Sequence, residues 1–291
     1  MKEMKKILST VFAVIVVVSC TRSNHYPTDS AGCGDRINNA YSKKDTLERM
    51  LERYAGLGIP GLVVAVYSPE GYWATAKGFA NVESKKPMDL CNIQYLQSIS
   101  KTYMAIAVLQ LQEAGWIDLD APITRYLPAR YSKYFDKPET VKVRNLMNHT
   151  SGIPEYTDVP EYIAYLLQHP DHSFTSEEFF EYIKNEKQRF IPGSKYVYTN
   201  TNYHLLALIA DSIAGDHGQL IQQKVLDPLQ LRNTFYRNSP GYLEYSELPA
   251  SYLDQFGMGN LADVTMMQQV SVACSKGDDG IVSTPSDAIR F

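Results

Sequence analysis

The sequence has little that would suit it to nucleic acid or to the interior of a membrane. Its 28 lysine and arginine residues are outnumbered by 32 aspartate and glutamate residues, so the net charge is −4. Nucleic-acid binding relies on a positively charged surface, and this balance gives no sign of one. After the first twenty residues, no apolar run is long enough to span a bilayer. We therefore expect no nucleic-acid partner and no membrane span in the body of the chain.

The signatures of several enzyme classes are also missing. The sequence has no Gly-x-Ser-x-Gly elbow, no His-Glu-x-x-His helix and no phosphate-binding loop. Cysteine occurs four times, and cysteine and histidine together show no metal-ligand spacing. The one dense cluster, from His169 to His172, includes a proline and loop-like flanks that favour a solvated turn. These absences argue against an α/β-hydrolase and a zinc protease, and we expect no metal and no cofactor.

The first twenty residues do contain an apolar run, which follows a basic start. Residues 7–18 are long enough for a signal peptide and too short to span a membrane comfortably. The run ends in Val-Val-Ser-Cys, which resembles the lipobox of bacterial lipoproteins. The resemblance implies a signal peptide over 1–19, lipidation of Cys20 and a polar tether over 20–43. A plain secretory signal and an uncleaved anchor are the alternatives.

Export has consequences for surface charge and for the cysteines. Residues 1–19 contain three lysines and one glutamate, so their removal leaves a net charge of −6. Such a surface is not drawn to anionic lipid, and attachment would depend on the acyl chains alone. An oxidising compartment allows one disulfide among Cys33, Cys91 and Cys274, and the sequence does not say which pair forms.

The remaining 44–291 segment predicts an α/β domain of the α+β kind. Leu47, Met50, Leu51 and Tyr54 share one face of a predicted helix, and two β-rich runs surround the turn at Pro69 to Gly71. A long and mostly helical stretch follows. Near the end, Thr284 and Pro285 form a helix start, yet the sequence stops at Phe291. A two-stranded hairpin is marginal alone, so we expect further strands and a chain that is truncated at its C-terminus.

A serine and a lysine lie three positions apart where an apolar helix is predicted to begin. Ser98 and Lys101 form the only Ser-x-x-Lys in the sequence. On a helix these positions share a face, with Cβ atoms about 5–6 Å apart. The helix N-terminus favours a nucleophilic hydroxyl, and apolar neighbours favour an unprotonated amine. The alternative is an N-cap serine followed by a surface lysine.

A second short motif precedes another predicted helix. In "YVYTNTNY", Tyr198 and Asn200 are separated by one residue. A phenol beside an ammonium can act as a second base, and a fixed side-chain amide can hold a substrate amide. The alternative is ordinary, because the chain has 21 tyrosines and Asn200 or Thr201 could simply cap the helix.

Taken in order, the two motifs resemble those of the serine β-lactamase and penicillin-binding-protein family. Further segments match the family's landmarks in sequence: "YLQSISKTYMAIAVLQLQEAGWIDLDAPITRYLP", "VRNLMNHTSGIPEY", "FIPGSKYVYTNTNYHLLALIADSIAG", "QKVLDPLQLRNTFY" and "SKGDDGIVSTPSDAIRF". The tyrosine of the second motif resembles the branch of class C β-lactamases, D-alanyl-D-alanine carboxypeptidases and esterases. This implies a β-lactamase/DD-peptidase-like fold, with an antiparallel sheet flanked by helices and a mostly helical lobe.

The resemblance also implies roles for four residues. Ser98 would be the acylated nucleophile, and Lys101 would take or shuttle its proton. Tyr198 would be the partner base that later activates water, and Asn200 would orient the substrate amide. The His149-Thr150-Ser151 segment would be a structural turn that holds the helical lobe together.

One part of the family pattern is missing. No Lys-x-Gly or His-x-Gly occurs after Tyr198. In the family this third motif lies on a strand that lines the site and supplies an oxyanion donor, whose loss costs about 10²–10³ in rate. The implied function is an acyl-enzyme hydrolase for a cell-wall D-peptide, a β-lactam or a small ester. The alternatives are a penicillin- or peptidoglycan-binding protein without turnover and an inactive truncated remnant. The substrate and the oligomeric state stay open.

Overall fold

The computed structural model describes residues 37–236 and 248–291 of the chain. The N-terminal part begins with α1 (Lys44–Gly56), followed by the antiparallel strands β1 (Gly61–Ser68) and β2 (Gly71–Asn81). Ser68 pairs with Gly71 across the predicted turn, where Gly71 has the left-handed φ of +106° that the turn requires. The short strand β3 (Lys86–Pro87) extends this sheet beyond β2. The predicted helix and hairpin are thus confirmed.

A second small sheet lies between this hairpin and the helices. It has the order β4 (Gln94–Tyr95), β8 (Ile281–Ser283) and β5 (Thr234–Tyr236), with both pairings antiparallel. The central strand β8 is fully buried and is followed by α10 (Pro285–Arg290), which contacts β1. As predicted, Thr284 caps α10 by accepting from the Asp287 N–H, and Pro285 is its first residue.

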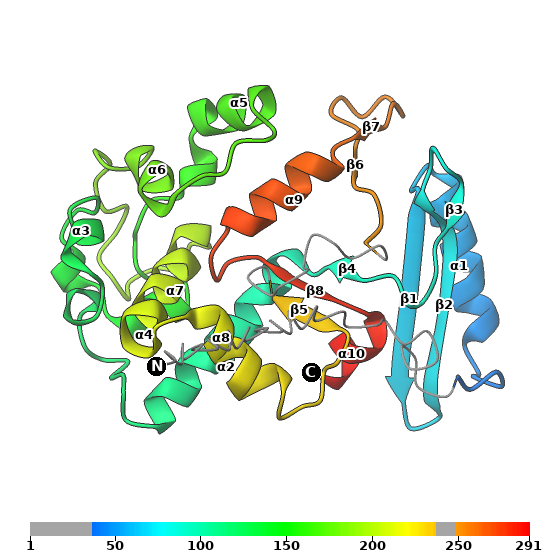
Figure 1. The fold of residues 1–291 in the computed structure, drawn as a ribbon, viewed down its shortest axis with the longest axis horizontal. Coiled ribbons are helices and arrows are strands. Elements are labelled where there is room, and N and C mark those ends of the chain that lie inside the picture. Colours follow the sequence, from blue (N-terminus) through cyan, green and yellow to red (C-terminus); the bar gives the residue numbers. More distant parts are fainter. Residues whose placement is uncertain (1–36, 237–247) are drawn as a thin grey trace, which may run out of the picture.

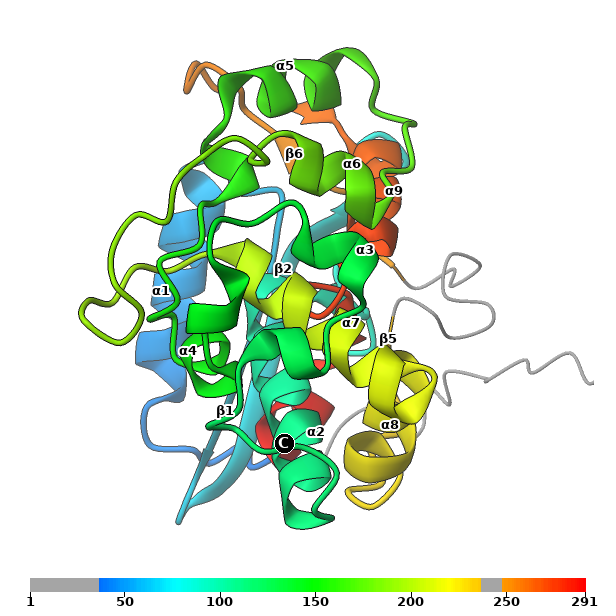
Figure 2. The ribbon, with the colours of Figure 1, turned by 90° about the vertical axis from the view of Figure 1, so that its left-hand side faces the viewer.

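The helical lobe is built around two long helices, α2 (Ser100–Glu113) and α7 (Asn200–Ala214). They contact each other inside the lobe (Figures 1 and 2). Every residue from Thr201 to Ala210 of α7 is buried. Shorter helices surround them, and these are α3 (Ala129–Ser132), α4 (Val143–Met147), α5 (Pro160–Gln168), α6 (Ser176–Glu181) and α8 (His217–Ile221). A capping box between Thr175 and Glu178 begins α6.

One more segment joins the lobe to the small sheet. The hairpin β6 (Tyr252–Leu253) and β7 (Ala262–Asp263) leads into α9 (Thr265–Cys274), which lies beside the helical lobe (Figure 1). The arrangement confirms the predicted fold class of antiparallel strands flanked by helices, together with a mostly helical lobe. None of the helices within the described ranges has the length and apolar character that crossing a membrane requires.

The structure excludes one of the three cysteines that could form the predicted disulfide. Cys91 is disulfide-bonded, whereas Cys274 is a buried free thiol whose Sγ lies 3.3 Å from Ser173 Oγ. Cys274 is therefore not a member of the pair. Cys20 and Cys33 lie outside the described residues.

Candidate active site

Ser98 lies in a single 3₁₀ turn, Gln97–Ile99, that leads directly into α2. The α-helix itself begins two residues later than Ser98, so the serine precedes the helix rather than starting it. Gln97 has a left-handed φ of +48°, and Ser98 is exposed to solvent. A 3₁₀ turn still places residues i and i+3 on one side. Accordingly, Lys101 Nζ donates to Ser98 Oγ at 3.1 Å, so the two side chains lie on one side as their spacing predicts.

The phenol of Tyr198 completes the surroundings of the serine hydroxyl. Tyr198 OH donates to Ser98 Oγ at 2.8 Å, although one hundred residues separate them in sequence. The ammonium of Lys101 lies over the Tyr198 ring, 5.1 Å from its centroid. Ser98 Oγ therefore lies within hydrogen-bond distance of two groups that can accept or donate a proton.

Lys101 is buried, and its ammonium is fully hydrogen-bonded. Besides Ser98 Oγ, it donates to Asn200 Oδ1 and to the backbone oxygen of Asp278, both at 2.8 Å. An ammonium has three protons, and here each one has an acceptor. These bonds offset the cost of removing the charge from water, since only 5% of the lysine is exposed.

Asn200 is the first residue of α7, and its amide oxygen faces Lys101. Its amide nitrogen lies 3.5 Å from Glu155 Oε1. The four residues selected from the two sequence motifs thus meet at one place, where the start of α2 approaches the start of α7. The other selected residue, Cys20, lies outside the described residues.

The sequence did not single out Glu155, which holds the start of α7. This carboxylate is 4% exposed and accepts from the backbone N–H groups of Asn200 and Thr201, the latter at 3.4 Å. The first N–H groups of a helix have no partner within the helix and favour a negative charge. Glu155 therefore fixes the helix start that presents Asn200 to Lys101. The available signal was an acidic residue within the apolar turn "SGIPEY".

A second acidic feature was also missed, between α9 and β8. The Asp278 carbonyl accepts from Lys101, while its carboxyl is buried and accepts from Tyr156 OH at 3.4 Å through Oδ2. Its Oδ1 has no hydrogen-bond partner among the described residues. Burial raises the pKa of Asp278 to about 7 and that of Asp279 to about 6, and the nearby Lys101 charge opposes both shifts.

The Asp278 carboxyl predicts a pH-dependent effect on stability. In the unfolded chain an aspartate ionises near pH 4, whereas in the folded chain Asp278 keeps its proton to about pH 7. A raised acid pKa therefore costs the folded state increasing free energy as pH rises from 4 to 7. We expect Asp278→Asn to unfold like the wild type at pH 4. At pH 8 it should be more stable, by on the order of a few kcal/mol.

Urea unfolding of the two proteins across this pH range measures the difference directly. The exposed Asp171→Asn is the matched control, and as a surface substitution it should change the free energy of unfolding by less than about 0.5 kcal/mol. A constant difference between Asp278→Asn and the wild type at all pH values would contradict the assignment of a raised pKa.

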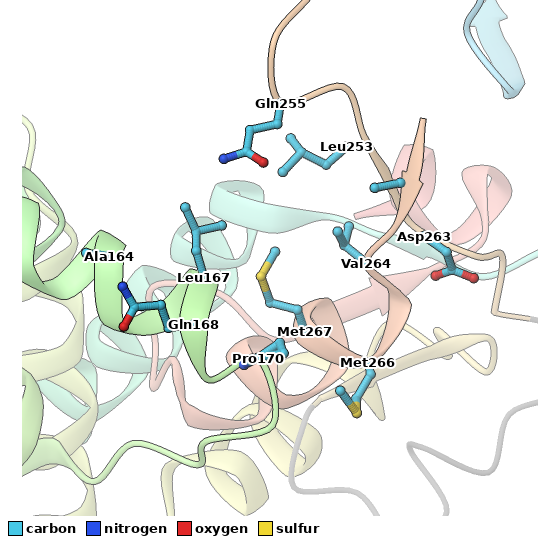
Figure 3. A pocket seen from close by; sticks show the side chains of 11 residues that line it. Ala164, Leu167, Gln168, Pro170, Leu253, Gln255, Asp263, Val264, Met266 and Met267 are labelled. Carbon is cyan, nitrogen blue, oxygen red and sulfur yellow. The ribbon is translucent and has the colours of Figure 1, made fainter. Parts of the chain in front are cut away.

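An apolar groove lies between α5 and the β6–β7–α9 segment (Figure 3). Its volume is about 470 Å³, and Leu167, Leu253, Met266 and Met267 are among its lining residues. None of Ser98, Lys101, Tyr198 and Asn200 lines it. The groove and the hydrogen-bonded cluster around Ser98 are thus separate features. Within the described ranges, no group of three His, Cys, Asp or Glu side chains is placed to hold a metal ion.

Comparison with known proteins agrees with this arrangement. The family model described as Beta-lactamase matches residues 47–291, which is most of the chain. The chain belongs to the beta-lactamase family. It is 25% identical over 247 residues to penicillin-binding protein 4* of Bacillus subtilis, covering 79% of this chain and 51% of that protein. This family membership confirms the resemblance drawn from the sequence.

Other members of the beta-lactamase family are similar at the same level. D-alanyl-D-alanine-carboxypeptidase/endopeptidase AmpH of Escherichia coli is 25% identical over 252 residues, covering 83% of this chain and 60% of that protein. A crystal structure of D-stereospecific amidohydrolase from Streptomyces sp. superimposes with a TM-score of 0.72 at 25% identity. That match covers 85% of this chain and 71% of the other. The chain spans about half the length of the curated relatives that it matches.

Proposed function

We propose that this chain is a serine hydrolase that forms an acyl-enzyme on Ser98 and hydrolyses an amide or ester bond. The main supporting observation is that Ser98 Oγ accepts hydrogen bonds from both Lys101 Nζ and Tyr198 OH. A serine hydroxyl is a weak nucleophile, and it needs an adjacent base to take its proton as it attacks. Two candidates for that base lie within 3.1 Å of the oxygen.

In the proposed cycle, Lys101 or Tyr198 first loses a proton to solvent, and Ser98 Oγ then attacks the substrate carbonyl carbon as its own proton passes to that group. The proton then moves to the leaving amine or alcohol as the carbonyl–leaving-group bond breaks, which leaves an ester on Ser98. Water attacks this ester as the same base takes its proton, and the base then gives that proton to Ser98 Oγ as the acyl–Oγ bond breaks, which releases the acid product and free Ser98. The N–H of Ser98, in the 3₁₀ turn before α2, is our candidate donor to the developing oxyanion.

We propose a small molecule or a peptide as the substrate, with D-amino acid amides and D-alanyl-D-alanine peptides as the first class. The relatives named above support this choice, since their names specify D-stereospecific amide and peptide hydrolysis. A β-lactam and a small ester are the other candidates.

The proposal also includes export and lipid anchoring through Cys20, which labelling with a palmitate analogue tests in the wild type and in Cys20→Ser.

A hydrolysis panel tests the proposed function. The chain is given D-alanine amide, an acyl-D-Ala-D-Ala peptide, a penicillin and a p-nitrophenyl ester, with L-enantiomers for the first two. We expect product release over many turnovers from at least one substrate, with the D-form preferred to the L-form. A single equivalent of product followed by a stable adduct would overturn hydrolysis and indicate a binding protein without turnover. No product and no adduct from any substrate would overturn the proposal altogether.

A further inference from the structure

Tyr198 is exposed and belongs to no regular element. Its side chain is 43% exposed, and the preceding Tyr196 and Val197 are 66% and 39% exposed. The helix α7 starts only two residues later, at Asn200. A phenol on such a segment needs a support if its hydroxyl is to stay 2.8 Å from Ser98 Oγ.

His149 contacts this segment on both sides of the tyrosine. The N–H of Val197 donates to the His149 carbonyl at 2.9 Å, and the N–H of Thr199 donates to His149 Nδ1 at 3.3 Å. Between these two bonds, the imidazole and the Tyr198 ring face each other at a tilt of 32°, with centroids 4.5 Å apart. The three contacts hold the backbone before Tyr198, the backbone after it and its ring.

We propose that His149 is a positioning residue that holds Tyr198 OH against Ser98. It acts through its hydrogen bonds from the Val197 and Thr199 N–H groups and through the ring contact. Its effect on the reaction rests on the function proposed above, whereas its effect on the position of Tyr198 does not. This goes further than the structural turn predicted from the sequence. That turn is also present, since Ser151 Oγ donates to Asn202 Oδ1 of α7 at 2.6 Å.

The state of the histidine at neutral pH suits this role. His149 is 8% exposed, and burial together with the nearby Lys101 charge lowers its pKa to about 4, although Glu155 acts in the opposite direction. At pH 7 the ring is therefore neutral, and Nδ1 can accept from Thr199. The titratable groups that face it are Lys101 of α2, Glu155, Tyr196 and Tyr198 of the loops, and Tyr203 of α7.

Protonation reverses this arrangement. Below about pH 4 the imidazole becomes a cation, so Nδ1 turns from an acceptor into a donor that faces the Thr199 N–H. A second positive charge also appears near Lys101. Both changes weaken the support of Tyr198, and the rate of reaction at Ser98 should fall about tenfold per pH unit below this value.

Two substitutions of His149 test whether a hydrogen-bond acceptor at this position is enough to hold Tyr198, or whether the imidazole itself is needed. His149 has a left-handed φ of +56°, which asparagine tolerates better than most residues. His149→Asn keeps that backbone and an acceptor near Nδ1, whereas His149→Ala keeps neither the acceptor nor the ring. For labelling of Ser98 by a fluorophosphonate at pH 7, we expect a loss of about 100-fold for His149→Ala and about tenfold or less for His149→Asn. Because His149 is proposed to act through the Tyr198 hydroxyl, the loss of labelling rate in Tyr198→Phe is the upper limit for the loss in His149→Ala.

The matched control is another buried histidine of the same lobe. His204 is fully buried and bonded to Ser176 Oγ at 2.9 Å. His204→Asn should lower the melting temperature and leave the labelling rate of folded protein within threefold of the wild type. If His149→Ala also stays within threefold while Tyr198→Phe is strongly impaired, the proposal is overturned.

A second readout does not depend on activity. A 3-fluorotyrosine placed at position 198 gives one ¹⁹F signal from the full chain, and that signal reports the ring's surroundings. We expect its chemical shift to titrate near pH 4 in the chain with His149 and not in His149→Asn. The same titration in both chains, or in neither, would overturn the inference. If no covalent probe labels the chain, the proposed function is wrong, and the ¹⁹F titration still tests the role of His149.

Discussion

Replacing Ser98 with alanine is expected to lower kcat/KM by at least about 10⁴-fold, to the background rate. In our account Ser98 Oγ is the atom that is acylated, so neither Lys101 nor Tyr198 can substitute for it. The fold should survive the change because Ser98 is exposed and lies in a turn before α2. We therefore expect a melting temperature within a few degrees of the wild type, measured together with steady-state kinetics on the best substrate.

A surface serine provides the control for this substitution. The hydroxyl of Ser84 donates to Asn81 Oδ1 at 2.7 Å in the turn between β2 and β3, and Ser84 is exposed. Ser84→Ala should retain full activity. Activity of Ser98→Ala within tenfold of the wild type would rule out Ser98 as the nucleophile.

Replacing Lys101 with methionine is expected to lower kcat/KM by about 10³–10⁴-fold, with most of the loss in kcat. The methionine side chain has a similar volume but can neither donate nor accept a proton. Asn200 Oδ1 and the Asp278 carbonyl lose the bond from Lys101, and Ser98 Oγ keeps only the one from Tyr198 OH. The serine loses a possible base, and the amide of Asn200 loses the contact that orients it.

The same substitution should affect stability in a pH-dependent way. Lys101 holds down the pKa values of the buried Asp278 and Asp279, so its removal raises both further. At pH 8, where wild-type Asp278 and Asp279 are ionised, Lys101→Met should unfold more easily than the wild type. At pH 5, where both carboxyls are protonated, the difference should be smaller.

Lys187 provides the control for the lysine. It forms an ion pair with Asp136, in which 85% of the lysine side chain and 21% of the aspartate side chain are exposed. Lys187→Met should leave kcat unchanged, because Lys187 does not contact Ser98, Tyr198 or Asn200. A Lys101→Met enzyme with more than a tenth of wild-type kcat would contradict the assigned role.

Local sequence rules predicted the parts of the site whose geometry is local. Ser98 and Lys101 meet because a helical turn places residues three apart on one side, whether the turn is 3₁₀ or α. The hairpin at Pro69 to Gly71 and the cap at Thr284 were predicted for the same reason. Tyr198 and Asn200 have no local link to Ser98, and only the resemblance to a family placed them together.

The missed residues depend on contacts between distant parts of the chain. Glu155 bonds to Asn200 across 45 positions, and the Asp278 carbonyl meets Lys101 across 177. An isolated acidic residue is usually solvated, so neither Glu155 nor Asp278 could be distinguished from the other acidic residues of the sequence. The position of His149 also depends on a left-handed backbone, which a sequence pattern predicts poorly for residues other than glycine and asparagine.

Other sequence predictions concern segments beyond the described residues. The signal peptide over 1–19, lipidation at Cys20 and most of the tether lie before residue 37. They rest on a basic start, an apolar run and a terminal cysteine, and they stay predictions.

The most direct test of the central claim is the intact mass of the chain after incubation with a covalent probe. A penicillin adds its whole mass when its ring opens on Ser98, and a fluorophosphonate adds its phosphonyl group as fluoride leaves. We predict an increase of one such unit with at least one probe, located on the peptide that contains Ser98 and absent from Ser98→Ala. No increase with either probe, or an increase that persists in Ser98→Ala, would contradict the account.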